Sequence, residues 1–184
     1  EFSKGEFLFF LNNDTQVKPG WLDSLLATFE LRPDAGLVGS KLIYPDGRLQ
    51  EAGGIVWSDG SGWNYGRHQD PELPQFNYLK EVDYVSGAAV MCRRALFIEL
   101  GGFDERYVPA YYEDTDLAFK IRQVGKKVYL QPNSEIVHYE GVSNGTDTEV
   151  GIKGHQLINQ KRFREKWAEI LATDHFANGE NVLM

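Results

Sequence analysis

The sequence predicts an α/β domain, because apolar runs of strand length alternate along the chain with segments whose apolar residues recur at helical spacing. The strand-like runs are short and continuously apolar, which is typical of sheets covered on both faces. With 184 residues, the chain is also long enough to form one domain with a real core.

In the first half of the chain we expect two strands, a helix and a long loop. The run FLFFL at 7–11 forms a buried strand. A helix begins near Pro19, a residue favoured at first helical positions, and ends before the sequence RPDAG. A second strand covers 36–44. Residues 58–80 show little periodicity and form a long loop, and such loops in compact domains are often functional.

The second half continues the alternation of strands and helices. In chain order we expect a strand over 81–94, a short helix over 95–100, a helix from Glu113 to Gly125, short strands at 126–130 and 135–139, and an amphipathic helix over 149–171. The tail, 172–184, shows no readable pattern. The sequence therefore predicts one domain that ends near residue 171.

Composition narrows the class of protein. The formal net charge is −8, which argues against a nucleic-acid-binding surface, since that surface requires a net basic face. The single cysteine, Cys92, excludes an intramolecular disulfide and any multi-cysteine metal site, and it fits a reducing compartment. No apolar stretch approaches the roughly 18 residues of a membrane span, and no signal-peptide pattern opens the chain. We expect a cytoplasmic globular protein.

Four basic residues on the last predicted helix leave one alternative open for its location. They are Lys161, Arg162, Arg164 and Lys166. A solvated face is the favoured interpretation, and the alternative is peripheral contact with anionic lipid headgroups at the inner face of a membrane.

Polar residues come directly after the first predicted strand. Asn12, Asn13 and Asp14 succeed 7–11, and ligands of α/β sheets collect at the carboxyl ends of strands. Carboxylate and amide oxygens suit a hard cation such as Mg²⁺ or Mn²⁺, but one carboxylate holds it weakly, so substrate phosphates would have to complete the shell. The alternative, which this stretch alone favours, is that these residues only end the strand and cap the next segment of the chain.

The segment YYEDTDLAFKIRQVG places carboxylates at the start of a helix. At about 100° per residue, one stripe holds the apolar side chains at 117, 118, 121 and 124, and Asp114 falls near its centre. Glu113 lies at the edge of the stripe, whereas Asp116 points away and is spaced to pair with Lys120. A carboxylate on an apolar face is costly to bury unless it has partners or a function, and partial burial raises its pKa toward the range of a general base. Complementing the helix dipole is the alternative, which explains Asp114 least well.

His138 closes the predicted strand at 135–139. A lone histidine at a strand end is more often a hydrogen-bonded structural residue than a ligand. The other three histidines, His68, His155 and His175, show no partner pattern, and the sequence assigns them no role.

Four stretches of the chain, in order and spacing, resemble the family 2 inverting glycosyltransferases of GT-A fold, particularly the rhamnosyltransferase-like bacterial members. The stretches are GEFLFFLNNDTQVKPGWL, SGAAVMCRRALFIELGGFDERY, YYEDTDLAFKIRQVGKKVYLQP and IVHYEGVSNG. The resemblance extends over about residues 4–171. It implies a GT-A-type, Rossmann-like mixed sheet with flanking helices.

The resemblance also implies roles for individual residues. The NND sequence matches the family's DXD-type motif, which assigns Asp14, with Asn12 as a weaker candidate, to a divalent cation (Mg²⁺ or Mn²⁺) that bridges the donor diphosphate. The YED sequence matches the acidic motif whose aspartate, here Asp114, deprotonates the acceptor hydroxyl. His138 matches a histidine that completes the metal shell in some members.

Small residues and a second carboxylate are implied to line the pocket. Gly87 and Ala88 match the segment beside the donor sugar and the acceptor, where small side chains allow close approach. Glu113, next to Asp114, is assigned to the same pocket. Asp104 and Glu105, in the GGFDERY stretch that precedes the acidic helix, are expected to be structural.

Two departures from the family pattern refine these expectations. The first motif position is Asn12 rather than aspartate, so tight metal binding without a nucleotide is not expected. The sequence QKRFREKW lacks the QxxRW arrangement of processive polysaccharide synthases, which favours transfer of a single sugar.

The family pattern also implies a missing half-site. In this family the strands and loops that hold the nucleotide base and ribose precede the DXD-type strand, which begins here at residue 7. We therefore expect 1–171 to be the C-terminal portion of a single GT-A domain. Alone, it should be inactive, and it should self-associate through the exposed strand at 7–11.

The sequence thus predicts a fragment of an inverting glycosyltransferase. Its partners would be a nucleotide diphosphate sugar donor and a carbohydrate or lipid-linked hydroxyl acceptor, as in cell-surface polysaccharide synthesis. One alternative is a non-catalytic carbohydrate-binding or assembly module that kept the fold. Another is a metal-dependent phosphohydrolase, which would usually need more carboxylates around the ion.

Overall fold

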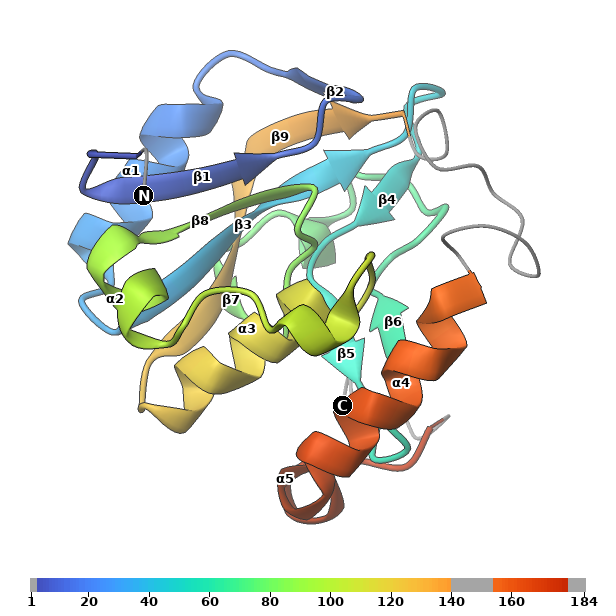
Figure 1. Ribbon diagram of the computed structural model, residues 1–184. Coiled ribbons are helices and arrows are strands. Elements are labelled where there is room, and N and C mark those ends of the chain that lie inside the picture. The colour runs from blue at the N-terminus through green and yellow to red at the C-terminus, as the bar shows by residue number, and fades with distance from the viewer. Residues whose placement is uncertain (1–2, 140–153, 179–184) are drawn as a thin grey trace.

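The computed structural model describes residues 3–139 and 154–178, and its centre is a mixed β-sheet (Figure 1). The sheet has seven strands in the order β1-β8-β3-β9-β2, with β4 paired to β3 and β7 paired to β9. Its strands are β1 (Phe7–Leu11), β2 (Thr15–Val17), β3 (Ala35–Ile43), β4 (Leu49–Glu51), β7 (Lys80–Glu81), β8 (Ala89–Arg93) and β9 (Lys127–His138). A separate two-stranded sheet joins β5 (Gly54–Val56) to β6 (Gly62–Asn64).

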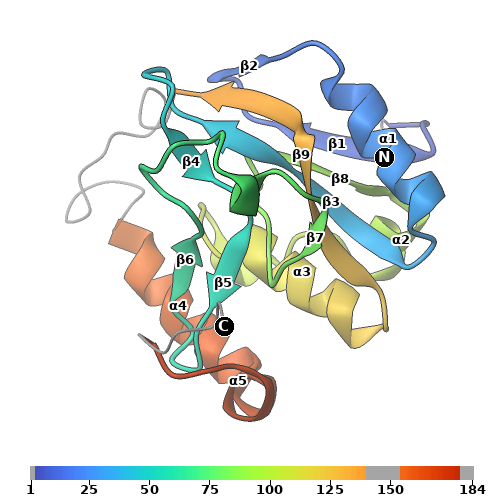
Figure 2. The ribbon, with the colours of Figure 1, turned by 180° about the vertical axis from the view of Figure 1, so that it is seen from behind.

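Helices cover both faces of the large sheet. They are α1 (Trp21–Leu31), α2 (Arg94–Glu99), α3 (Glu113–Gln123), α4 (His155–Lys166) and α5 (Ala168–Asp174), with the 3₁₀ turns η1 (Pro74–Phe76) and η2 (Glu105–Tyr107). Figure 1 shows α3 and α4 on the near side, and Figure 2, from behind, shows α1 on the other.

The alternation of side chains along β3 explains why apolar clusters form on both faces of the large sheet. In β3, which is buried over its whole length, Leu37 packs in the cluster that contains the α3 residues Leu117 and Ile121. The next residue, Val38, packs on the opposite face in the cluster that contains Leu25 of α1. Successive side chains of a strand point to opposite faces. A strand that is buried along its whole length, as β3 is, therefore fits a sheet that is covered on both faces.

The direction of the strands determines where the site lies. Both β1 and β3 pair antiparallel with β8, so they run parallel to each other, and β9 pairs parallel with β3. The carboxyl ends of β1, β3 and β9 therefore meet at one edge of the sheet. That edge carries Asn12 and Asp14 after β1, and His138 at the end of β9.

The predicted strands at 7–11 and 36–44 and the short helix at 95–100 are confirmed to within one residue, and the helix that starts near Pro19 begins two residues later. The single strand predicted over 81–94 is wrong: the structure has β7 and β8, and residues 82–88 between them are outside both strands. The sheet needs two separate partners here, since β7 pairs with β9 and β8 joins β1 to β3. The two strands predicted at 126–130 and 135–139 are one continuous strand, β9, which absorbs a register shift against β3.

The C-terminal helix also differs from the prediction. Instead of one helix over 149–171, the structure has α4 and α5, which break at Trp167. Residues 149–153 and 179–184 lie outside the described residues. The predicted tail contributes to the fold, because residues 172–174 complete α5 and the ring of His175 stacks on Phe119 at 5.2 Å. The short strands β2 and β6 were not anticipated.

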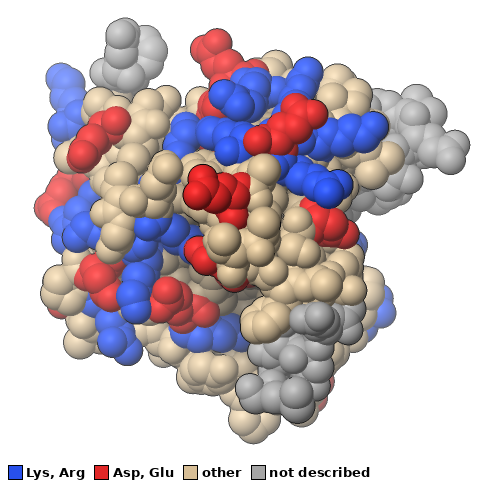
Figure 3. Space-filling model, turned by 90° about the horizontal axis from the view of Figure 1, so that it is seen from below, with Lys and Arg blue, Asp and Glu red and all other residues tan. Residues whose placement is uncertain are grey.

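Acidic and basic side chains lie next to one another on the face shown in Figure 3. Acidic side chains also form ion pairs with neighbouring basic ones: Asp104 accepts from Lys166 at 2.9 Å and from Arg106 at 2.8 Å. The structural role expected for Asp104 thus has a physical basis, because this carboxylate connects the turn η2 to α4. Its hydrogen bonds outweigh the effect of burial and hold its pKa below the ordinary value.

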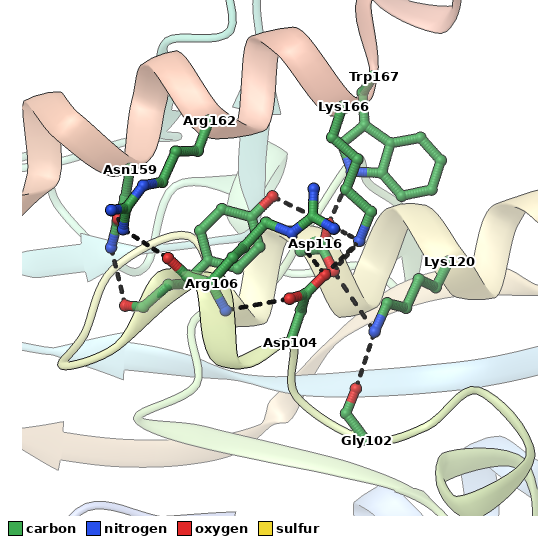
Figure 4. A network of polar contacts seen from close by, with 10 residues as sticks. Gly102, Asp104, Arg106, Asp116, Lys120, Asn159, Arg162, Lys166 and Trp167 are labelled. Atoms are coloured by element: carbon green, nitrogen blue, oxygen red, sulfur yellow. Dashed lines mark hydrogen bonds and ion pairs between the residues drawn. The ribbon is translucent and has the colours of Figure 1, made fainter.

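Asp116 is the centre of a buried polar network (Figure 4), although the sequence placed it away from the apolar stripe of its helix. Its side chain is 0% exposed. It accepts hydrogen bonds from the Tyr107 hydroxyl at 3.1 Å and the Trp167 indole at 2.8 Å, and it pairs with Lys166 at 2.7 Å. The predicted pair with Lys120 exists at 3.5 Å. A helical wheel drawn for one apolar stripe misses this contact, because α4 and α5 cover a second side of α3.

The Asp116 network predicts a large stability effect. Asp116→Ala should lower the free energy of unfolding by about 3–5 kcal/mol, because it leaves the buried Tyr107 hydroxyl and Trp167 indole without their acceptor and removes one of the two carboxylates that pair with Lys166. Urea denaturation monitored by tryptophan fluorescence measures this change. The matched control is Glu30→Ala, which removes an exposed acid from α1 and should change stability little. Equal effects of both substitutions would contradict the assignment.

Candidate active site

A cleft of 1120 Å³ lies at the carboxyl edge of β1, β3 and β9. Its wall includes the end of β1, strands β4 and β6, the turn at 86–88, the segment 103–115 and His138. Every site residue predicted from the sequence is among its lining residues except Asn13, which was part of the polar motif only. The fold thus gathers motifs that are up to about 120 residues apart.

Asp14, His138 and Asn12 form one group in this cleft. His138 Nε2 lies 3.3 Å from Asp14 Oδ1 and 3.5 Å from Asn12 Nδ2. The other ring nitrogen of His138, Nδ1, lies 3.0 Å from Gln50 Oε1. When Nδ1 donates its proton to Gln50, Nε2 presents a lone pair toward the carboxylate, which is the tautomer of a metal-binding histidine.

The donor set fits a divalent cation, held by few protein ligands. A carboxylate oxygen, an imidazole nitrogen and an amide are ligands that Mg²⁺ or Mn²⁺ accepts. The Asp14 carboxylate oxygen and the His138 Nε2 lone pair face each other at 3.3 Å. A cation between these two electron-pair donors would stabilise the arrangement. Within residues 3–139 and 154–178, however, no group of three His, Cys, Asp or Glu side chains is arranged to hold a metal. Phosphate oxygens of a substrate would therefore have to complete the shell.

Asp114 lies in the first turn of α3 with its carboxylate fixed by hydrogen bonds. Oδ2 accepts from the Gly87 amide at 2.8 Å, and Oδ1 accepts from the Thr115 amide at 2.7 Å. Burial raises the pKa of Asp114, and these hydrogen bonds oppose the rise. The inward position predicted for Asp114 is thus confirmed, and the result is a carboxylate of defined orientation that lines the cleft.

Glu113 contributes a second carboxyl beside Asp114. Its Oε2 atom is buried and has no hydrogen-bond partner among the described residues. Burial and the neighbouring Asp114 raise the pKa of Glu113 to about 7. An unpaired buried oxygen is costly in a folded protein. Its position in the cleft wall is consistent with a group that receives its partner from a bound ligand.

The small residues Gly87 and Ala88 let the turn at 86–88 approach both Asp114 and the NND motif. A Cβ atom on Gly87 would lie 3.3 Å from the Asp114 Cβ, tighter than ordinary van der Waals contact. The carbonyl of Ala88 accepts the Asn12 amide at 2.9 Å. The turn therefore touches the aspartate of the acidic motif on one side and the NND motif on the other.

Asp114 is presented by a loop with unusual backbone geometry. Tyr111 and Tyr112, just before α3, have φ angles of 74° and 73°, in the left-handed region that side chains other than glycine disfavour. Asn159 of α4 holds this loop, since its amide nitrogen lies 2.8–3.0 Å from the carbonyl oxygens of Tyr107, Ala110 and Tyr111. Strain of this kind persists where the surrounding structure enforces it.

Two cleft residues were not predicted from the sequence. Gln50, which orients His138, and Glu51, which is 1% exposed, both lie on β4. The segment LQE is too short to show strand periodicity. The one signal in the sequence was a charged residue beside the small apolar run AGGIV.

Comparisons with known proteins identify the family and the fold of the chain. Residues 1–101 match the family model described as Glycosyl transferase family 2. An O-antigen biosynthesis protein of Myxococcus xanthus is 35% identical over 153 residues, which cover 79% of this chain and 12% of that protein. An N-acetylglucosaminyl-diphospho-decaprenol L-rhamnosyltransferase of Mycobacterium tuberculosis is 28% identical over 165 residues, which cover 82% of this chain and 52% of that protein.

A solved structure shares the fold. The crystal structure of GalNAc-T7 with UDP, GalNAc and Mn²⁺ superposes with a TM-score of 0.65 at 19% identity, covering 91% of this chain and 33% of that one. The mixed sheet with flanking helices is therefore of the GT-A type, as expected. Because the family model covers more than half of its residues, the chain belongs to glycosyl transferase family 2.

Proposed function

We propose that the protein transfers a sugar, with inversion, from a nucleotide diphosphate sugar to a hydroxyl acceptor in cell-surface polysaccharide synthesis. The observation that carries the proposal is the cleft itself. One part of its wall holds a carboxylate that backbone amides fix in orientation, and another holds a group that suits a divalent cation. Two relatives, named as an O-antigen biosynthesis protein and a rhamnosyltransferase, support a role in cell-surface polysaccharide synthesis.

Asp114 is the proposed catalytic base. It takes the proton of the acceptor hydroxyl, the acceptor oxygen bonds to the anomeric carbon of the sugar, and the bond from that carbon to the diphosphate breaks on the opposite face. Asp14 and His138, with Asn12 at their side, would hold the divalent cation. When bound, that cation would stabilise negative charge on the leaving diphosphate.

Gly87, Ala88 and Glu113 form the proposed pocket for the reacting sugar and the acceptor. The turn at 86–88 has little side-chain bulk, which leaves room beside Asp114. Glu113 Oε2 would accept a hydrogen bond from a sugar hydroxyl and so gain the partner that it lacks among the described residues.

The nucleotide base and the ribose of the donor would be held by residues other than those of the cleft. The chain spans 12% and 52% of the two curated relatives. We propose that the parent protein supplies those contacts. Since binding energy from such non-reacting parts positions the reacting carbon, the 184 residues alone would have little activity.

A non-catalytic binding module on the same fold is the main alternative. The fixed orientation of Asp114 disfavours it, because a binding module needs no carboxylate held by a backbone amide beside a metal-type group. A phosphohydrolase is disfavoured by the small number of acidic ligands near Asp14 in the described residues. Release of nucleoside diphosphate, rather than cleavage of simple phosphate esters, distinguishes transfer from both.

A peripheral membrane location remains a proposal. No helix among the described residues is long and apolar enough to cross a membrane. Of the four basic residues considered for lipid contact, Lys166 pairs with Asp116 and Arg162 donates to the Arg106 carbonyl. Lys161 and Arg164 are exposed and would make such contact.

The role of Asp114 predicts the effect of one substitution. In the active protein that carries this chain, Asp114→Asn should keep the fold and donor binding but lower kcat by about 10²–10⁴-fold, the usual contribution of a positioned base. Steady-state kinetics with a nucleotide sugar measures this. The control is Asp23→Asn, an exposed acid of α1. Near-normal turnover by Asp114→Asn would refute the assignment.

The metal group predicts dependence on the nucleotide. The 184-residue chain should bind Mn²⁺ weakly, and in the active protein Mn²⁺ binding should tighten when a nucleoside diphosphate supplies phosphate oxygens. Isothermal titration calorimetry measures both affinities, and His138→Ala should weaken the nucleotide-dependent one. Tight stoichiometric Mn²⁺ binding to the 184-residue chain would show that ligands beyond Asp14, His138 and Asn12 exist.

The outer edge of β1 predicts self-association. Among the described residues β1 pairs with β8 alone, so its other edge presents unpaired backbone groups. The 184-residue chain should form dimers or larger species with rising concentration, and it should not release nucleoside diphosphate from nucleotide sugars. Sedimentation velocity and a product assay test this. A monomer at all concentrations, or turnover that depends on Asp114, would contradict it.

A further inference from the structure

Two carboxyl groups in the cleft are attached to the same short turn. The Ser86 amide donates to Glu51 Oε1 at 2.9 Å, and the next amide, that of Gly87, donates to Asp114 Oδ2 at 2.8 Å. The Ala88 amide donates to the Ser86 hydroxyl oxygen at 3.2 Å. All three backbone donors of the turn are thus satisfied by side chains, two of them by acids from different elements.

Burial of the Glu51 side chain at the end of β4 costs free energy. Its side chain is 1% exposed, and it approaches Asp114, whose charge disfavours a second charge nearby. Tyr84 also faces it, and Arg67 is the cation that acts on it. A buried acid of this kind is retained where it has a function, because an apolar side chain at the end of β4 would fold at lower cost.

The charge state of the pair is a consequence of burial. Burial raises the pKa of Glu51 to about 8, and Asp114 adds to the rise while the Ser86 hydrogen bond opposes it. At neutral pH Glu51 therefore keeps its proton, and a neutral carboxyl still accepts from the Ser86 amide through its carbonyl oxygen.

We propose that Glu51 is a positioning residue for Asp114: its buried carboxyl anchors the turn at 86–88, and the Gly87 amide of that turn aims the Asp114 carboxylate into the cleft. This inference rests on the proposed function, in which Asp114 is the base. Glu51 acts through backbone that is shared with the base and makes no contact with the reacting atoms. A displacement of about 1 Å at a catalytic group can cost about 10²-fold in rate.

The test is a double-mutant cycle in the active protein that carries this chain. Glu51→Ala removes the acceptor of the Ser86 amide and should lower kcat roughly 10- to 100-fold with little change in the donor KM. Glu51→Gln keeps a neutral acceptor and should retain most of the activity. In an Asp114→Asn background, Glu51→Ala should cause no further loss, because no base remains to be aimed. Glu81→Ala, an exposed acid of β7, is the matched control.

The outcomes separate this inference from the proposed function. Loss of activity in Asp114→Asn with normal kcat in Glu51→Ala overturns the positioning role alone. Equal losses in Glu51→Gln and Glu51→Ala, or additive losses in the cycle, also overturn it. If Asp114→Asn has normal turnover, the proposed function fails instead.

A readout without turnover tests the anchor directly. In ¹⁵N-edited NMR spectra, Glu51→Ala should shift the amide resonances of Ser86 and Gly87, and Glu51→Gln should shift them much less. Unchanged resonances in Glu51→Ala would overturn the anchor.

The pH dependence of stability supplies a second check. A folded-state pKa of about 8, above the ordinary value of 4.5, means that unfolding releases a proton between these values, so wild-type stability falls as pH rises through this window. Glu51→Gln lacks this loss, so its thermal midpoint should gain on that of the wild type from pH 5 to pH 8. A constant difference between the two midpoints would overturn the inference that the Glu51 carboxyl is neutral in the folded protein.

Discussion

The buried carboxylate of Asp116 is the contact on which the geometry of the site depends. It joins α3 to the turn η2 through Tyr107, and to the C-terminal helices through Lys166 and Trp167. The residue two positions earlier, Asp114, belongs to the same helical turn and lines the cleft. Because the helix is rigid over this distance, an interaction made behind the site positions the backbone that carries Asp114, and the Gly87 amide then orients the carboxylate.

The cleft in front of that network is organised by backbone as much as by side chains. The turn at 86–88 gives one amide to Glu51 and the next to Asp114, and its Ala88 carbonyl accepts the Asn12 amide. Hydrogen bonds to backbone amides fix a carboxylate without bringing a cation close to it. The base candidate can thus remain oriented while its pKa is raised by burial.

Much of this arrangement was predictable, and the parts that were not have physical reasons. Continuous apolar runs such as β1 are dictated by local pattern, and the inward side of Asp114 is dictated by helical spacing. The burial of Asp116 was not predictable from α3 alone, because its partners Lys166 and Trp167 lie about 50 residues further along the chain. Glu51 was missed because a three-residue strand has no period to read.

The central claim is that one cleft holds a metal-dependent diphosphate site and a carboxylate base. A crystal structure of the active protein that carries this chain, grown with Mn²⁺ and a nucleoside diphosphate, tests it most directly. We expect an anomalous Mn²⁺ peak within bonding distance of Asp14 and His138, with the phosphates beside it and Asp114 facing the same cavity. A Mn²⁺ peak elsewhere, or a diphosphate bound outside this cleft, would contradict the claim.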